Sequence, residues 1–246
     1  MSRLRLFQIR LAASAALLLL VFALVRLLWY PGAYFTISGV STQFWILVGV
    51  VMAVGPVLST FVYKPAKKSL VMDLGILAAV ELAAVIVAAA ILFQGRPYFA
   101  VFAVDRFEAV ALGEVSGLDV SPDLLVGQTG QRQRLVYAEL PEDPDILSTL
   151  INETVLLGMA DIDRRPEFWR PYSDGLATIR AAALPLEALL GGDETRSAAV
   201  DKWLAKFGGS AHEYIYLPLR GKAGDATIIL RADTGYPVTT IEIDPW

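Results

Sequence analysis

The chain has 246 residues, of which 55% are hydrophobic and 19% are charged, and it contains no cysteine. Its mean hydropathy of +0.53 is too high for one ordinary soluble domain, while its charge content is too high for a protein buried wholly in a membrane. The absence of cysteine excludes a disulfide framework, thiolate nucleophiles and iron–sulfur ligands.

The charges are unevenly distributed along the chain. Seven basic and two acidic residues precede Arg96, which is a net charge of +5, whereas 14 basic and 23 acidic residues from Arg96 onward give −9. An acidic globular half argues against binding nucleic acid, because that affinity rests largely on neutralising phosphates. The sequence therefore predicts a membrane domain over residues 1–95 and one globular domain over residues 96–246.

Three apolar runs, at about residues 9–29, 44–62 and 70–93, are each long enough to cross a bilayer as a helix. The basic start MSRLR also fits a signal peptide, but no A-x-A cleavage site follows the first run, so we expect an uncleaved anchor. Aromatic residues after this run predict a belt at the far membrane interface. They are Trp29, Tyr30, Tyr34 and Phe35.

The turn YKPAKKS between the second and third runs carries Lys64, Lys67 and Lys68. Because cytoplasmic loops are enriched in Lys and Arg, this turn and the N-terminus are predicted to be cytoplasmic. Residues 96–246 then lie on the outer side of the membrane, which in a bacterium is the periplasm. The sequence thus predicts a multi-pass protein of the bacterial inner membrane with a periplasmic domain.

Glu81 lies close to the middle of the third run, where a carboxylate costs about 2.5–3.5 kcal/mol unless it is paired or protonated. One interpretation is an internal hydrogen bond to a neighbouring span, for instance at a carbonyl freed by Pro56. The other is a contact for an incoming transmembrane partner. Ala84 and Ala88 belong to pairs of small residues at four-residue spacing, which allow close helix packing in lipid. We therefore take Glu81, Ala84 and Ala88 as candidate partner contacts.

The half from residue 96 onward alternates between strand and helix signals. Aromatic and β-branched residues over 96–112 indicate one long strand or two paired strands. A Pro-Asp start, apolar residues at helical spacing and a terminal Gly158 predict a helix over 141–158. This order of elements predicts an α+β fold with an antiparallel sheet. The remaining expected elements are a strand at 134–140, helices at 173–190 and 194–207, and strands at 213–219, 225–231 and 237–243.

The sequence offers little for catalysis. His212 is the single histidine, so a zinc site is not expected, and no G-x-S-x-G elbow accompanies it. The DTG at 233–235 resembles an aspartic protease loop, but there is one copy and it stands where a hairpin turn is needed. The acidic residues at 142–145 favour a helix start. We expect no enzyme activity, no metal and no cofactor.

The stretch RPEFWRPYS, at 165–173, combines two prolines with the rings of Phe168, Trp169 and Tyr172. Prolines restrict the backbone, and these rings offer a large contact area at a low cost in side-chain entropy. The three rings are therefore candidate partner contacts. The alternative interpretation is that they fill the core of the globular domain.

Several stretches together carry a resemblance to a known family: WYPGAYF, the span with Gly55-Pro56, FVYKPAKKSLVMDL, GRPYFAVFAVDRFEAV, ELPEDPD, RPEFWRPYS, YLPLRGKAGDATIILRADTG and IDPW. With these stretches the chain resembles the type IV pilin accessory proteins of the TfpX/TfpZ kind. The resemblance extends over nearly the whole sequence and is loose between residues 184 and 209.

The resemblance implies an inner-membrane protein that assists the production or surface assembly of a type IV pilin, with no catalytic residues to transfer. Pilins enter the membrane by one apolar N-terminal helix that bears a glutamate near its start. The implied role is a chaperone or adaptor for a pilin. The implied partners are the membrane-inserted pilin, membrane lipid and other pilus assembly proteins. The alternative is a membrane-anchored periplasmic enzyme or sensor whose catalytic site cannot be recognised in the sequence.

Overall fold

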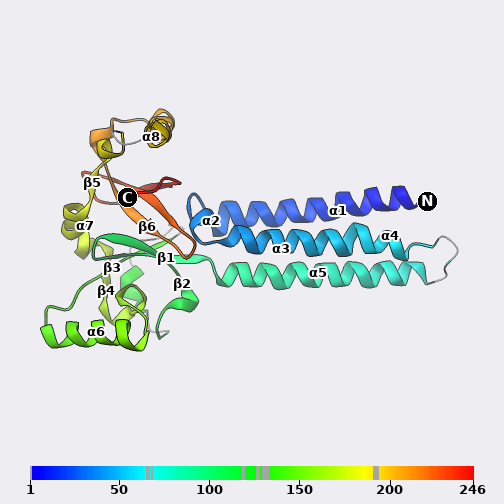
Figure 1. The fold of residues 1–246 in the computed structure, drawn as a ribbon, viewed down its shortest axis with the longest axis horizontal. Helices are drawn as coiled ribbons and strands as arrows, with labels where there is room; N and C mark the ends of the chain where they lie inside the picture. Colours follow the sequence, from blue (N-terminus) through cyan, green and yellow to red (C-terminus); the bar gives the residue numbers. More distant parts are fainter. Residues whose placement is uncertain are drawn as a thin grey trace. The chain divides into compact units, whose positions relative to one another are not determined.

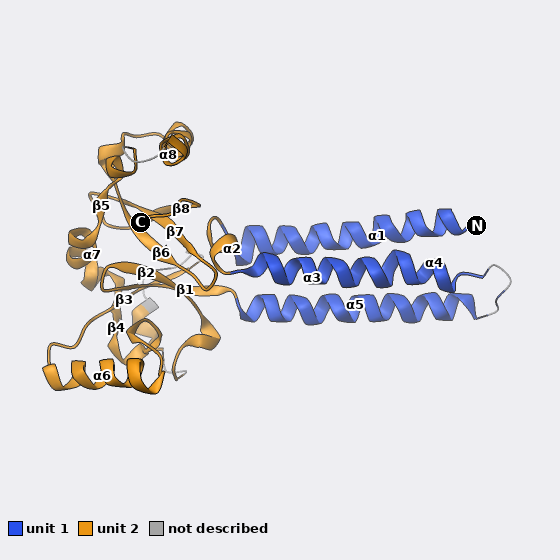
Figure 2. Ribbon diagram, viewed as in Figure 1, with its two compact units in different colours: residues 1–31, 39–95 blue, residues 32–38, 96–246 orange. Residues whose placement is uncertain are grey.

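The computed structural model describes residues 2–64, 67, 69–117, 120–125, 128, 133–190 and 194–246. The chain forms two compact units, which Figure 2 shows in different colours. The helical unit comprises Met1–Pro31 and Gly39–Gly95, and the α+β unit comprises Gly32–Ser38 and Arg96–Trp246. Three long apolar helices followed by a sheet with helices confirm the predicted fold class.

In the helical unit, three long helices lie side by side (Figure 1). The first is α1 (Arg3–Leu24), which continues through a π-helical turn at Val25–Trp29. The second is α3 (Val40–Met52), a π-helical turn at Ala53–Leu58 and α4 (Ser59–Val62); the third is α5 (Leu70–Gln94). Each is long and apolar enough to span a bilayer, so this is a membrane protein.

The wider turn within the second helix coincides with Pro56. Proline has no backbone N–H and its ring pushes away the preceding turn, so the regular α-helical ladder cannot pass through it. The helix accommodates Pro56 by widening and continues as far as Val62.

Two of the four aromatic residues of the predicted belt, Tyr30 and Tyr34, are buried. The hydroxyl of Tyr30 donates a hydrogen bond to the carbonyl of Leu92 at 2.7 Å, and the ring is 2% exposed. It therefore joins the ends of two helices within the helical unit. Tyr34 is buried inside the α+β unit, and burial raises the pKa of its hydroxyl far above the usual range.

Residues 32–38 link α1 to α3 in sequence, yet they pack as part of the α+β unit. Their short helix α2 (Tyr34–Ile37) is joined to the sheet by two hydrogen bonds. The Ala33 amide donates to Thr240 Oγ1 at 3.0 Å, and the Ala223 amide donates to the Ile37 carbonyl at 2.7 Å. These residues fall within the membrane domain predicted over residues 1–95, and contacts over such separations leave no local pattern in the sequence that would place them elsewhere.

Within the described residues, eight strands form one sheet in the order β4-β3-β1-β2-β6-β7-β8, with β5 paired to β6. The run 96–112 is two paired strands, β1 and β2. The sheet is mixed, because β1–β3 and β2–β6 are parallel while the other pairs are antiparallel. The strands are β1 (Pro97–Ala103), β2 (Arg106–Ala111), β3 (Arg134–Ala138), β4 (Trp169–Pro171), β5 (Leu184–Pro185), β6 (Tyr214–Arg220), β7 (Asp225–Arg231) and β8 (Pro237–Ile241).

Besides α2, the α-helices of this unit among the described residues are α6 (Pro144–Leu157), α7 (Leu176–Ala182) and α8 (Glu194–Phe207). The Asp143 side chain caps α6 by accepting a hydrogen bond from the Asp145 amide at 2.8 Å, and Gly158 ends it at φ +65°.

The helix predicted over 173–190 is wrong in extent, because α7 ends at Ala182. Pro185 cannot continue a helix, and the chain instead forms β5 beside β6. A short 3₁₀ turn at Leu186–Leu189 follows, and its two leucines pack in the core with Val200 and Trp203 of α8.

Candidate functional site

The carboxylate of Glu81 is the centre of a polar cluster inside the helical unit. It accepts hydrogen bonds from Arg10 Nη2 at 2.7 Å and from Ser14 Oγ at 2.6 Å, and the residue is 5% exposed. The first contact is also an ion pair. Glu81 therefore has its charge balanced within the bundle rather than exposed to lipid.

The same cluster reaches the middle helix. Arg10 Nε donates to Ser59 Oγ at 3.2 Å and lies 3.5 Å from the carbonyl oxygen of Gly55. Gly55 is needed for this approach, because a Cβ there would lie 2.2 Å from Ser14 Oγ and 2.8 Å from Glu81 Oε1. Polar groups from all three long helices thus meet at one point.

This arrangement agrees with an internal hydrogen bond at Glu81, but the partner differs from the expected one. A freed carbonyl could pair only with a protonated Glu81, whereas the Glu81 of this ion pair accepts hydrogen bonds from donors. The missed donors are Arg10 and Ser14 on α1. Their four-residue spacing places both on one helix face, and this was the available signal in the sequence.

An apolar groove of about 600 Å³ runs between α3 and α5 on another face of the bundle. Ala84 and Ala88, two of the predicted contacts, both line it. Glu81 does not line it, so the predicted partner contacts do not form one site: Glu81 faces the polar cluster, whereas Ala84 and Ala88 face the groove. Gln43 supplies the polar side chain of the groove. The lining residues are Gln43, Ile46, Leu47, Val50, Val80, Ala83, Ala84, Val87, Ala88, Ile91 and Leu92.

Two of the three rings in the segment 165–173 lie in the core of the α+β unit. The Trp169 indole N–H donates to the carbonyl of Ile162 at 3.2 Å, and its ring packs edge-on against Phe99 at 4.9 Å between centroids. The Tyr172 hydroxyl donates to the carbonyl of Gly235 at 2.6 Å, and burial strongly raises its pKa. Phe168 is only partly buried, so it alone of the three presents part of its ring to a surface.

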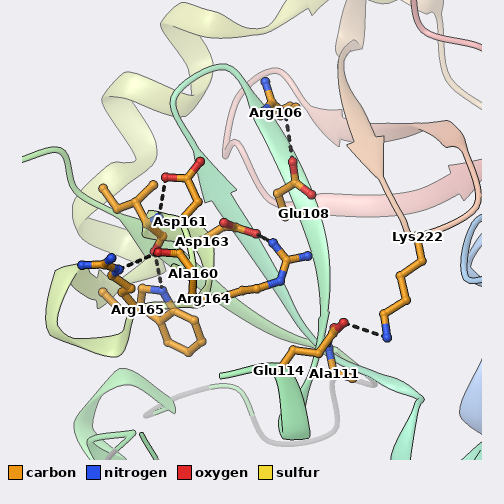
Figure 3. A network of polar contacts seen from close by, with 12 residues as sticks. Arg106, Glu108, Ala111, Glu114, Ala160, Asp161, Asp163, Arg164, Arg165 and Lys222 are labelled. Carbon is orange, nitrogen blue, oxygen red and sulfur yellow. Dashed lines mark hydrogen bonds and ion pairs between the residues drawn. The ribbon is translucent and has the colours of Figure 1, made fainter. Parts of the chain in front are cut away.

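Sequence reasoning missed a second polar cluster in the α+β unit, which lines one groove together with residues of α6. Figure 3 shows the contacts of this cluster. Arg106 Nε donates to Glu108 Oε1 at 2.8 Å, and Arg164 forms an ion pair with Asp163. Burial raises the pKa of the Glu108 carboxyl, while its bond to Arg106 opposes the rise. Burial likewise raises the pKa of Asp163, against the nearby charge of Arg164. The two pairs come from β2 and a distant loop, so no sequence motif unites them.

The three apolar helices and the α+β unit together define a membrane protein with a globular domain. The chain is similar to the fimbrial assembly protein of serogroup I from Dichelobacter nodosus, with 25% identity over 239 residues, 92% of this chain and 89% of that protein. It is also similar to the serogroup E1 protein of that organism, with 26% identity over 231 residues, 90% of this chain and 87% of the relative. Both similarities are consistent with the type IV pilus accessory family. No family model and no solved structure matches the chain.

Proposed function

We propose that this protein assists fimbria biogenesis as a membrane-bound chaperone or adaptor for a type IV pilin. Similarity over about nine tenths of the chain to two fimbrial assembly proteins supports the general role. The α3–α5 groove carries the more specific proposal. In this role the protein binds and presents its partner and performs no chemical reaction.

The groove suits one apolar helix. Its walls on α5 are formed largely by alanine and valine, and small side chains let two helix backbones approach closely in lipid. A pilin subunit inserts through one apolar helix, so its dispersion contacts with Ala84 and Ala88 would replace contacts with lipid tails. The Gln43 amide can offer such a helix a hydrogen bond that lipid tails cannot.

The proposal includes an orientation: the N-terminus and the turn at residues 63–69 are cytoplasmic, and the α+β unit is periplasmic. Of the turn's lysines, Lys68 lies outside the described residues. A reporter active only in the periplasm should be active when fused after Trp246 and inactive when inserted at Ala66. The reverse pattern would place the α+β unit away from a periplasmic pilin head and refute the orientation.

Filling the groove tests its occupant. Ala84→Phe places a ring in the groove, whereas Ala90→Phe makes the same change at an exposed α5 position that does not line it. Pilin should co-purify with the wild type and with Ala90→Phe, and its yield should fall at least about fivefold with Ala84→Phe, which is about 1 kcal/mol of binding. Equal yields from the two variants would show that the helix binds elsewhere.

The same purification separates the proposal from its alternative. A membrane-anchored periplasmic enzyme or sensor would retain no more pilin than an unrelated membrane protein of similar abundance. Retention by the wild type above that control supports the chaperone or adaptor role, and absence of retention refutes it.

A further inference from the structure

A second groove, of about 610 Å³, lies in the α+β unit between α6 and the turn end of the β1–β2 hairpin. One wall is apolar and comes from α6, with Leu147, Ile151 and Val155 among its residues. The opposite side is basic, and it includes Arg106, Arg164 and Arg220. We refer to it below as the α6 groove.

The apolar wall is largely uncovered. In α6, all of whose residues are described, Leu150 is the one buried residue. Ile151 is 51% exposed and Val155 is 72% exposed, and the neighbouring Leu156 and Leu157 are exposed as well. A helix of a globular domain normally buries such a face, so an extended uncovered one indicates an interaction surface.

On the basic side, two arginines are more exposed than the lining carboxylates with which they pair, and Arg106 also pairs with the exposed Asp105 at 3.0 Å. The side chains of Arg106 and Arg164 are each 30% exposed, whereas those of their partners Glu108 and Asp163 are 12% and 6% exposed. Each carboxylate is therefore less exposed than its arginine and holds it in position; Figure 3 shows the two pairs. Such fixed guanidiniums match a carboxylate geometrically.

Arg220 adds a further charge at the end of β6. It is exposed, and within the described residues its side chain forms no ion pair. Asp161 is the exposed acidic residue of the lining, and its carboxylate already accepts a hydrogen bond from the Ile162 amide at 2.7 Å. Arg220 is thus the lining arginine whose charge is not already paired with a carboxylate within the described residues.

Backbone strain marks the same place. Val104, at the tip of the β1–β2 hairpin, has φ +61° and is 56% exposed. A β-branched residue is unfavourable in this region, and glycine or asparagine would be the ordinary choice. Val104 also lines the α6 groove, so this unfavourable turn lies at the edge of the groove.

We infer that the α6 groove binds a segment of the pilin head in which a carboxylate stands next to apolar side chains. The carboxylate pairs with Arg164 and Arg220, and the apolar side chains cover Ile151 and Val155. This inference rests on the proposed function, since it names a second contact with the same partner. The groove is confined to the α+β unit, so it can be tested separately from the α3–α5 groove.

A photo-crosslinking amino acid at Val155, in the full-length protein and in cells that make pilin, tests the inference. The matched control carries the same amino acid at Val238, which is 39% exposed on β8 and does not line the groove. We expect a pilin adduct, identified by antibody, at Val155 and at least about fivefold less at Val238. Arg220→Gln should lower the Val155 adduct about threefold to fivefold, as expected for one exposed ion pair, while Lys202→Gln on α8 should leave it unchanged.

Each other outcome overturns the inference in an identifiable way. If pilin co-purifies but the adduct is equal at Val155 and Val238, the α6 groove is not its binding site, although the proposed function survives. If Arg220→Gln leaves the adduct unchanged, the partner segment does not bind through a carboxylate. A lipid adduct at Val155 would assign the apolar face to the membrane. If pilin does not co-purify with the wild type, both proposals fail.

Discussion

Glu81→Leu tests whether the buried ion pair with Arg10 holds the three long helices together. The change removes two hydrogen bonds, of 2.7 Å and 2.6 Å, and leaves the Arg10 guanidinium without a counter-charge. Removing one member of a buried ion pair costs about 3–5 kcal/mol, and an unpaired arginine in a membrane helix costs about 2.5–3.5 kcal/mol. Because the Arg10 side chain is 18% exposed, we expect a loss near the lower values, about 3 kcal/mol.

Three further variants distinguish charge pairing from simple packing. Glu81→Gln keeps the shape and can still accept hydrogen bonds but leaves Arg10 unbalanced, so its loss should be smaller than that of Glu81→Leu. Ser14→Ala removes one hydrogen bond and should cost about 1–3 kcal/mol. The double variant Arg10→Leu/Glu81→Leu leaves no buried charge and should be more stable than Glu81→Leu alone.

The assay is unfolding of the purified full-length protein in mild detergent by added dodecyl sulfate, followed by tryptophan fluorescence. Two results would refute the reasoning. Glu81→Leu could be as stable as the wild type, which would mean that the contact contributes nothing. Alternatively, the loss of the double variant could equal the sum of the losses of Glu81→Leu and of the single variant Arg10→Leu, about 6 kcal/mol if each costs about 3 kcal/mol, which would mean that the residues do not interact.

Three other predictions concern packing and pH. Gly55→Ala should lower the free energy of unfolding by about 1–3 kcal/mol in the same assay, because the added Cβ has no room. Gly49→Ala, where nothing lies within 4 Å of the added Cβ, should be neutral or slightly stabilising. Equal effects of the two changes would contradict the close approach of the helices at Gly55. Trp169→Ala should lower the free energy of unfolding by about 3–5 kcal/mol, because the ring is buried in the core. Phe168 is only partly buried, so Phe168→Ala should cost about 1–2 kcal/mol. The reverse order would exclude the placement of Trp169 in the core. Burial raises the pKa of the Asp163 carboxyl above its ordinary 3.8, so the folded chain binds the carboxyl proton more tightly than the unfolded chain does. The free energy of unfolding therefore falls as the pH rises from about 3.8 through the raised pKa. The melting temperature of the wild type relative to Asp163→Asn should therefore drop as the pH rises above about 4, and a constant difference would refute the shift.

The candidate site could be predicted in its residue types but not in its partners. Glu81 is conspicuous because a carboxylate in an apolar run is costly, and Ala84 and Ala88 are recognisable by their spacing. That Glu81 faces Arg10 while Ala84 and Ala88 line a groove depends on how α5 is rotated against its neighbours. This rotation is set by contacts among three helices and is not encoded in the pattern of any one of them.

Local patterns determined the elements themselves. Apolar length identified the three spanning helices, and the cap at Asp143 with the terminal Gly158 identified α6, because such signals act over a few residues and survive in any tertiary context. The exception was the helix predicted over 173–190. Its apolar pattern also fits a buried 3₁₀ turn, and Pro185 prevents the helix from continuing.

Only the tertiary structure decided how these elements combine. The parallel pairs β1–β3 and β2–β6 depend on where the chain returns to the sheet after long excursions. The packing of residues 32–38 on the α+β unit depends on hydrogen bonds to Thr240 and Ala223, about two hundred positions away. The α6 groove likewise joins arginines from β2, β6 and the loop after α6. Interactions over such separations have no period along the chain, because they arise from which surfaces the folded elements leave available to one another.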